Sequence, residues 1–279
     1  MSKKIKRIIP THWFCLIIGM YLIGLHKSTS IGVSTPLSFL CLNTLIPRWG
    51  CANLASWTIS TLMVLYVLTP VLIKYLSKIP KHWLLFTALV IAALSMLLNM
   101  TLYDPKNETM FWFLYISPYF RIVTYSIGIL LGLYVKGASI HSKDSISLKI
   151  SLIEIAFYIL MGMFIYEFHK VTGYWYTIPI ILLILLSVNG SGIISHLLKE
   201  KHVVRLAKYS FSFYLIHYPI LITVRYIIEK LEITNSTIIL LILLVSLISI
   251  FIVAVLMYHF IENKFINIQI QFKRIVIIC

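Results

Sequence analysis

The sequence predicts an all-α protein, a polytopic membrane helical bundle of about eight transmembrane helices with both termini cytoplasmic. Three observations predict it. Of the 279 residues, 60% are hydrophobic and 12% are charged, whereas about 25% of the residues of a soluble domain are charged. The apolar residues gather in runs long enough to cross about 30 Å of hydrocarbon. The basic residues lie between these runs and concentrate on one predicted side of the membrane.

The apolar runs give the expected spans in order. Their approximate bounds are 11–26, 55–75, 83–103, 110–135, 149–166, 175–197, 209–227 and 236–260. The run at 110–135 is the least regular, because Pro118 and Arg121 lie inside it. The hydrophobic stretch after the basic N-terminus lacks a small-residue cleavage site, so no secretory signal is expected. We interpret residues 1–279 as a single membrane-embedded domain.

Membrane topology explains the net charge of +15. With the N-terminus placed in the cytoplasm, 17 of the 24 basic residues fall in inside segments and five in outside loops. This asymmetry agrees with the positive-inside rule. The basic residues form no single patch or stripe of the kind that binds nucleic acid. We therefore expect membrane lipid as the surroundings of the chain and no nucleic-acid partner.

The basic cluster at the N-terminus, K-K-I-K-R-I-I-P, has two interpretations. Lys4 and Arg7 are three residues apart and share one face of a helix. As topogenic anchors they would hold the N-terminus at the cytoplasmic surface, which composition alone favours. As a phosphate site they would bind an anionic cofactor through charge-assisted hydrogen bonds.

A long predicted outside loop, 27–54, leads into the second span. Ser56 and Ser60 are four residues apart and share a helix face. Trp57, between them, is interpreted as a belt residue at the membrane interface, where tryptophan is enriched. Alternatively, the segment lines the mouth of an external pocket, because long ordered loops are often functional.

The cysteines and histidines form no metal-binding motif. The sequence contains no C-x-x-C pair and no H-E-x-x-H, so no metal is expected. Cys41 and Cys51 fall in the same predicted outside loop, where oxidation is possible. A disulfide between them is a hypothesis, because spacing alone does not give the required geometry.

Arg121 lies within a predicted span, where a guanidinium needs a partner. A carboxylate, backbone carbonyls, water or a ligand anion would serve. Glu154 is the carboxylate deep in another predicted span, so an Arg121–Glu154 pair is one interpretation. In the same span as Arg121, Gly128 and Gly132 form G-x-x-x-G, a pattern that indicates close helix packing.

The stretch Y-S-F-S-F-Y-L-I-H-Y-P at 209–219 groups polar side chains on one predicted helix face. Ser210, Tyr214 and His217 stand at i, i+4 and i+7. Lipid cannot satisfy their polar atoms, so this face is expected to look into a protein interior or a wet cavity. It is interpreted either as a functional site or as a structural hydrogen-bonded seam. Near the end of the last span, His259 and Glu262 are expected to cap and anchor the helix.

Taken together, five stretches resemble the acyltransferase 3 family of polytopic membrane O-acyltransferases. They match that family in order over nearly the whole chain: K-K-I-K-R-I-I-P, S-W-T-I-S with the Tyr66 and Pro70 that follow, S-P-Y-F-R-I with G-I-L-L-G, Y-S-F-S-F-Y-L-I-H-Y-P-I, and F-I-E-N-K-F. The family modifies bacterial cell-surface polysaccharides and related substrates. The resemblance thus implies a multi-pass protein of the cell (inner) membrane.

The reaction that the resemblance implies is transfer of an acyl group, most often acetyl, from acetyl-CoA to a carbohydrate hydroxyl at the outer side. Lys4 and Arg7 would match the basic R-x-x-R motif of the family and bind the coenzyme A phosphates. Such chemistry needs a base and donors for an oxyanion. His217, Tyr214 and Arg121 are the candidate catalytic residues. Those of the substrate pocket are Trp57, Ser60 and Ser210.

The chain also departs from the family pattern. Members begin with an L-R-G segment and a histidine in the same first span, and no such R-G…H segment occurs here. The expectation is a chain that lacks about two N-terminal spans of the family. Leu62 and Thr124 replace two expected acidic residues. An alternative function follows, that of a non-enzymatic carrier or partner subunit that handles a glycolipid or polysaccharide.

Overall fold

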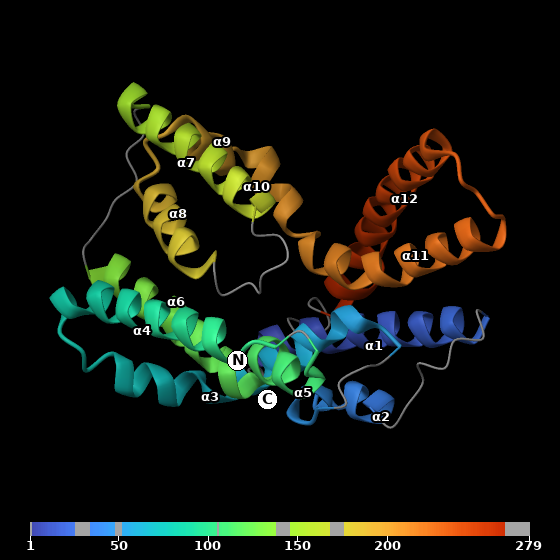
Figure 1. The fold of residues 1–279 in the computed structure, drawn as a ribbon, viewed down its shortest axis with the longest axis horizontal. Helices are drawn as coiled ribbons and strands as arrows, with labels where there is room; N and C mark the ends of the chain where they lie inside the picture. The colour runs from blue at the N-terminus through green and yellow to red at the C-terminus, as the bar shows by residue number, and fades with distance from the viewer. Residues whose placement is uncertain are drawn as a thin grey trace, which may run out of the picture. The chain divides into compact units, whose positions relative to one another are not determined.

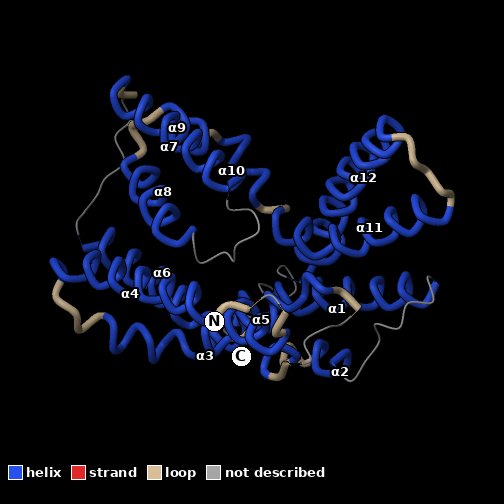
Figure 2. The backbone as a smooth tube through the Cα atoms, in the orientation of Figure 1, coloured by secondary structure: helices blue, strands red, loops and turns tan. Residues whose placement is uncertain are grey.

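A computed structural model describes residues 2–25, 34–47, 52–104, 106–137, 146–167 and 176–265 of the chain. Every regular element in these ranges is a helix, as Figures 1 and 2 show, so the all-α prediction is confirmed. In chain order the elements are α1 (Ser2–Leu25), α2 (Ser34–Phe39), η1 (Asn43–Leu45), η2 (Leu54–Ser56), α3 (Trp57–Leu76), α4 (Lys81–Leu102), α5 (Glu108–Phe111), η3 (Trp112–Ile116), α6 (Pro118–Gly137), α7 (Leu148–Glu167), α8 (Thr177–Asn189), α9 (Ile193–Lys199), α10 (Lys201–Ala207), α11 (Ser210–Lys230), α12 (Ser236–Met257) and η5 (Tyr258–Glu262).

The described helices are those of a multi-pass membrane protein. Six segments are long and apolar enough to cross a membrane, and the bent pair α8 and α9 makes a seventh if its halves form one span. The apolar part of α1, Ile8–Leu22, is shorter. Each of the eight predicted runs coincides with one to three consecutive helices. The number of spans and the side of the termini stay predictions.

The contacts within the chain group it into two compact units. The first unit comprises Met1–Met63 and Leu206–Cys279, and the second comprises Val64–Arg205. The first unit contains α1, α2, α11 and α12, and α11 packs against both α1 and α12. In the second unit α4 packs against α6, and α8 contacts both. The interpretation of 1–279 as one domain remains a prediction.

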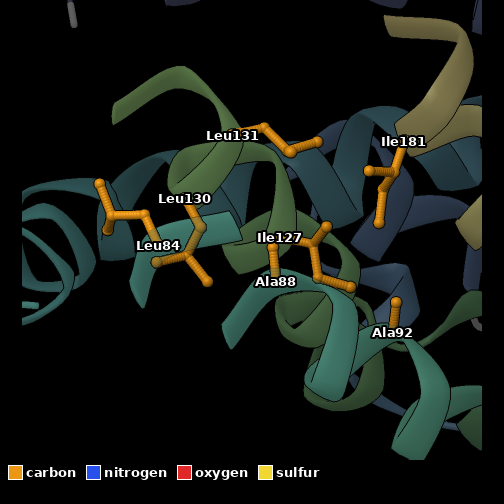
Figure 3. Packing of buried hydrophobic residues seen from close by; sticks show 7 residues of the cluster. All are labelled: Leu84, Ala88, Ala92, Ile127, Leu130, Leu131 and Ile181. Atoms are coloured by element: carbon orange, nitrogen blue, oxygen red, sulfur yellow. The ribbon is translucent and has the colours of Figure 1, made fainter. Parts of the chain in front are cut away.

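The core of the second unit is the apolar contact between α4, α6 and α8 (Figure 3). Its buried residues are Leu84, Ala88, Ala92, Ile127, Leu130, Leu131 and Ile181. Small side chains on α4 let α6 approach closely, as is usual between membrane helices. The predicted G-x-x-x-G contact is wrong: a Cβ atom built on Gly128 or Gly132 meets nothing within 4 Å. The close packing uses the alanines of α4 instead.

Glu154 of α7 is buried and binds the first turn of α9. Its Oε2 accepts the backbone N–H groups of Ile194 at 3.0 Å and Ser195 at 3.2 Å, and its Oε1 accepts the Ser195 hydroxyl. Ser151, one turn earlier, accepts the N–H of Ile193 at 3.0 Å. These bonds satisfy donors that a helix start leaves unpaired in a medium without water.

The Arg121–Glu154 interpretation is therefore wrong. The Glu154 carboxylate is occupied by α9, while Nε of Arg121 donates to the carbonyl oxygen of Tyr115 at 2.6 Å. Nε of Arg121 is thus paired with a backbone carbonyl of its own segment. Backbone carbonyls were among the partners that the sequence analysis considered for a guanidinium in a span.

The described part of the predicted outside loop folds back along α1. Nε2 of His12 lies 2.8 Å from the carbonyl oxygen of Ser38, and Nε1 of Trp13 donates to that of Phe39 at 2.8 Å. His12 lies 13 residues before the end of α1, so α2 contacts α1 about 20 Å back along the helix axis from the point where α1 ends. The segment around α2 is thus packed inside the first unit. Cys41 in it is a buried free thiol, and Cys51, its hypothetical disulfide partner, lies outside the described residues.

Candidate active site

The predicted polar face of α11 is not the face that the helix buries. Ser210 is exposed and its hydroxyl donates to the carbonyl oxygen of Ala207 at 2.7 Å. Tyr214 is 36% exposed and His217 is half-buried. The expectation of a buried interior is therefore wrong for Ser210 and Tyr214, and the alternative, a face on a wet cavity, stays a prediction. The residues that α11 buries are Ser212, Leu215, Ile216 and Pro219.

Apolar packing decides the orientation of α11. Ser212 lies two residues after Ser210, about 200° further around the helix, so the two side chains point in nearly opposite directions. Leu215 and Ile216 are almost fully buried. Lipid tails are as apolar as leucine, so in a membrane this burial gains van der Waals packing between helices. On the same buried face the Ser212 hydroxyl donates to the Glu262 carboxylate at 2.9 Å.

Tyr214 and His217 are brought together on α11. Their ring centroids are 5.4 Å apart and the rings are tilted by 46°. Nδ1 of His217 contacts the carbonyl oxygen of Tyr214. A carbonyl only accepts hydrogen bonds, so Nδ1 carries the hydrogen atom of the neutral ring and Nε2 carries the lone pair. The arrangement fixes the tautomer of an imidazole whose Nε2 is a potential proton acceptor.

Ser60 and Trp57 lie at the start of α3, as predicted. Ser60 is fully buried and its hydroxyl donates to Oδ1 of Asn43 in η1. Trp57 is the first residue of α3 and is half-buried. Asn43 was not among the predicted site residues. It lies in the loop that folds back along α1. In the sequence it is only a polar residue between Pro36 and Pro47, a pattern too general to predict a contact with Ser60.

Asn53 joins the start of α3 to α11. Its Nδ2 donates to the carbonyl oxygen of Leu215 at 2.8 Å, and its Oδ1 accepts the N–H of Ala55 at 3.1 Å. Pro219 has no N–H group to offer Leu215, four residues earlier, so an intrahelical bond is missing there. Asn53 supplies it. From the sequence, Pro219 inside a predicted helix could have indicated that the Leu215 carbonyl needs a partner outside its own helix.

Glu262 is a second buried carboxylate, in the π-helical turn η5. It is fully buried and its Oε2 accepts the hydroxyl of Ser212 at 2.9 Å. The prediction that Glu262 caps the helix end at the surface is therefore wrong. His259 is exposed, and its ring centroid lies 6.0 Å from that of Tyr209. A π-helical turn often marks a functional site.

Arg121 belongs to the second unit and sits just after a helix break. The π-helical turn η3 ends at Ile116, and α6 begins at Pro118. The hydroxyl of Ser117 donates to the carbonyl oxygen of Phe113 at 2.7 Å. The guanidinium carbon of Arg121 lies 4.6 Å from the ring centroid of Tyr115, whose carbonyl Nε binds. Stacking and the hydrogen bond together fix the orientation of the guanidinium group.

Lys4 and Arg7 lie in the first two turns of α1, as predicted, and the structure describes their backbone but not their side chains. Their i, i+3 spacing places them on one face of that helix. His12, also in α1, is fully buried and was not among the predicted site residues. Within the described ranges, no group of three or more His, Cys, Asp or Glu residues is placed to hold a metal ion.

One comparison with known proteins gives a match. A family model described as an acyltransferase domain, that of the acyltransferase 3 family, matches residues 1–259. No curated protein and no solved structure matches the chain. The matched range includes α1, α6 and α11, the helices that carry the predicted catalytic and cofactor-binding residues.

Proposed function

Because the chain belongs to the acyltransferase 3 family, we propose that it transfers an acyl group from a coenzyme A thioester to a hydroxyl of a cell-surface polysaccharide or related carbohydrate. Acetyl-CoA is the proposed donor, and the cell (inner) membrane is the proposed location. The family match over residues 1–259 carries this proposal. The helices long and apolar enough to cross a membrane fit an enzyme embedded in lipid.

The proposed base is His217. With the hydrogen atom held on Nδ1 by the Tyr214 carbonyl, Nε2 has the lone pair that accepts the proton of the attacking hydroxyl. The hydroxyl oxygen forms a bond to the thioester carbon, and the C–S bond then breaks. The same proton passes from Nε2 to the departing sulfur, which releases coenzyme A and returns His217 to its neutral form.

Two further side chains are proposed to favour the transfer. The phenol of Tyr214, adjacent to His217 on the same helix, would donate to the oxygen that becomes negative as the thioester is attacked. Arg121, in the second unit, is proposed to be required for acyl transfer independently of these two residues. Its guanidinium is held by Tyr115 and is thereby preorganised to stabilise negative charge.

The binding of donor and acceptor is assigned to other residues. Lys4 and Arg7 are proposed to bind the coenzyme A phosphates, since two cations on one helix face suit an anion with several oxygen atoms. Trp57, Ser60 and Ser210 are proposed to line the acceptor pocket. The support for Ser60 is its burial beside Asn43 in the first unit.

The test is acyl transfer by the purified full chain in detergent. The protein is incubated with radiolabelled acetyl-CoA and a panel of methyl glycosides, and labelled glycoside is separated by chromatography. Formation of acetylated glycoside supports the proposal. Absence of labelled glycoside with every acceptor, from protein that remains folded, would instead favour the non-enzymatic carrier or partner subunit.

A further inference from the structure

A groove runs between α11 and α12 in the first unit. The two helices form an antiparallel hairpin (Figure 1), and the ring centroid of Tyr209, just before α11, lies 5.1 Å from that of Tyr258, just after α12. The groove has a volume of about 330 Å³. The residues that line it include Ile220, Val224, Leu241, Ile242, Ser246 and Ser249.

The groove is apolar although two serines line it. The Ser246 hydroxyl donates to the carbonyl oxygen of Leu243 at 2.8 Å, and the Ser249 hydroxyl donates to that of Val245 at 2.9 Å. Both hydroxyl hydrogens are thus used inside α12. None of the described residues that line the groove carries a charge. The groove therefore suits a hydrocarbon chain and gives a charged ligand no counter-charge.

The groove is recessed between the two helices. Ser246 is 4% exposed, whereas Leu241, on the same helix, is 57% exposed. Ile220, Val224 and Ile242 are half-buried. The side chain of Ser246 is small, so a recess opens between the longer side chains around it.

The groove continues the face of α11 that carries His217. Ile220 lies three residues after His217 and Val224 seven residues after it, so all three positions fall within about 60° around the helix. The Cβ atoms of side chains three residues apart are about 5–6 Å from each other. A thioester carbon within reach of Nε2 of His217 therefore has the apolar groove one turn further along α11.

The dimensions of the groove fit a medium-length chain. Between Leu241 and Ser249, α12 rises by about 12 Å. A water molecule takes up about 30 Å³, and a methylene group is of similar size. The groove volume of about 330 Å³ thus corresponds to a chain of about ten carbon atoms. An acetyl group alone would fill only a small part of it.

We infer that the groove between α11 and α12 holds the acyl chain of the donor and extends the donor class from acetyl-CoA to medium-chain acyl-CoA, an inference that rests on the proposed function. The hydroxyl attack and the departure of coenzyme A are unchanged, and the groove binds only the carbon atoms beyond the thioester. The tail of a membrane lipid is the competing occupant. Continuity with His217 favours the donor, because the donor chain is bonded to the carbon that reacts there.

Two substitutions change the groove in opposite directions. Val224→Phe places a larger side chain in the groove two turns beyond His217 and shortens it. Ile242→Ala removes a half-buried side chain from the opposite wall and enlarges it. Each has a matched control at an exposed position that does not line the groove. Val67→Phe in α3 makes the first change, and Ile248→Ala in α12 makes the second.

The affinity of the purified full-length variants for acetyl-, butyryl-, hexanoyl-, octanoyl- and decanoyl-CoA is measured by titration calorimetry in detergent. Each methylene group that enters the groove leaves water, so the parent protein is expected to bind octanoyl-CoA at least about tenfold more tightly than acetyl-CoA. Val224→Phe should lower this ratio several-fold. Ile242→Ala should raise the affinity for decanoyl-CoA relative to octanoyl-CoA. Both controls should keep the parental ratios. Partition of the chains into detergent is common to all variants and cancels in the comparison.

The outcomes separate the groove from the proposed function. If both groove variants keep the parental ratios, the inference is overturned and the groove belongs to membrane lipid. Should Val224→Phe fail to fold, Ile242→Ala decides alone. If the parent protein transfers no acyl group to any methyl glycoside, yet the two variants shift the chain-length dependence as expected, the proposed function fails and the groove stands as an acyl-CoA site. Absence of binding by every acyl-CoA would end both.

Discussion

Nδ2 of Asn53 donates to the main-chain carbonyl oxygen of Leu215 at 2.8 Å, and Pro219 is the residue that leaves this carbonyl without its usual partner. A proline inside a helix cannot donate to the carbonyl four residues earlier. Within a membrane protein no bulk water replaces that bond. Asn53 therefore stabilises the α11 turn that separates Tyr214 from His217, and it ties this turn to the start of α3.

Replacing Asn53 by alanine is expected to destabilise the protein by about 1–3 kcal/mol, because the Leu215 carbonyl is left buried and unpaired. The measurement is thermal or denaturant unfolding of the purified protein in detergent. Asn107→Ala is a matched control: it removes a helix cap at an exposed site, where the Asn107 side chain accepts the N–H of Met110 at 3.0 Å. The control is expected to cost about 1 kcal/mol or less.

A second substitution tests the cause directly. Pro219→Ala restores an N–H group four residues after Leu215, so the loss caused by Asn53→Ala is expected to shrink when both changes are combined. The two single variants and the double variant form a mutant cycle. Strictly additive effects would show that the Asn53 bond does not compensate for Pro219.

Gly192 is expected to tolerate no larger side chain. A Cβ atom built on it collides with the Glu154 carboxylate, which is held in place by the first turn of α9. Gly192→Ala should therefore lower the unfolding temperature by several degrees. Gly128→Ala is the control, since a Cβ atom there meets nothing within 4 Å, and it should leave the temperature unchanged or raise it slightly. Equal effects of the two changes would contradict the contact between Gly192 and Glu154.

Hydropathy was sufficient to predict the long helices, but not the short helices α2 and α10. The eight apolar runs coincide with helices because lipid selects long apolar segments that satisfy their own backbone hydrogen bonds. The break between α8 and α9 inside the predicted run 175–197 falls at Gly190, Ser191 and Gly192. These residue types favour a turn, although the length of the run suggested one span.

Contacts between distant parts of the chain could not be predicted from the sequence. The bonds of His12 to Ser38 and of Asn53 to Leu215 join residues 26 and 162 positions apart. No periodicity encodes such pairs. The i, i+4, i+7 pattern placed Ser210 with Tyr214 and His217 correctly on one face, but apolar packing by Leu215 and Ile216 turned a different face inward.

Arg121→Lys is expected to abolish acyl transfer as fully as Arg121→Ala. A lysine keeps the charge but lacks the planar group that binds the Tyr115 carbonyl and stacks on its ring. Both variants should insert in the membrane and purify normally, because Arg121 is not part of the α4–α6–α8 core. The measurement is acetyl transfer to methyl glycosides. Activity retained in Arg121→Ala would show that acyl transfer does not require Arg121.

The double variant Lys4→Ala with Arg7→Ala is expected to weaken the binding of coenzyme A by at least about tenfold, since two charge-assisted contacts to phosphate would be lost. Titration calorimetry of the purified protein measures this. Lys78→Ala is the control, an exposed lysine whose Nζ lies 5.3 Å from the ring centroid of Tyr75. An unchanged affinity in the double variant would leave Lys4 and Arg7 as topogenic anchors only.

The central claim is that His217 serves an acyl transfer to a hydroxyl. The most direct measurement compares the parent protein, His217→Ala and the exposed-histidine control His82→Ala in proteoliposomes supplied with radiolabelled acetyl-CoA and methyl glycosides. We predict labelled glycoside with the parent protein and His82→Ala, release of its label by mild alkali as expected for an ester, and none with His217→Ala. Ester formation that continues in His217→Ala at the parental rate would contradict the account.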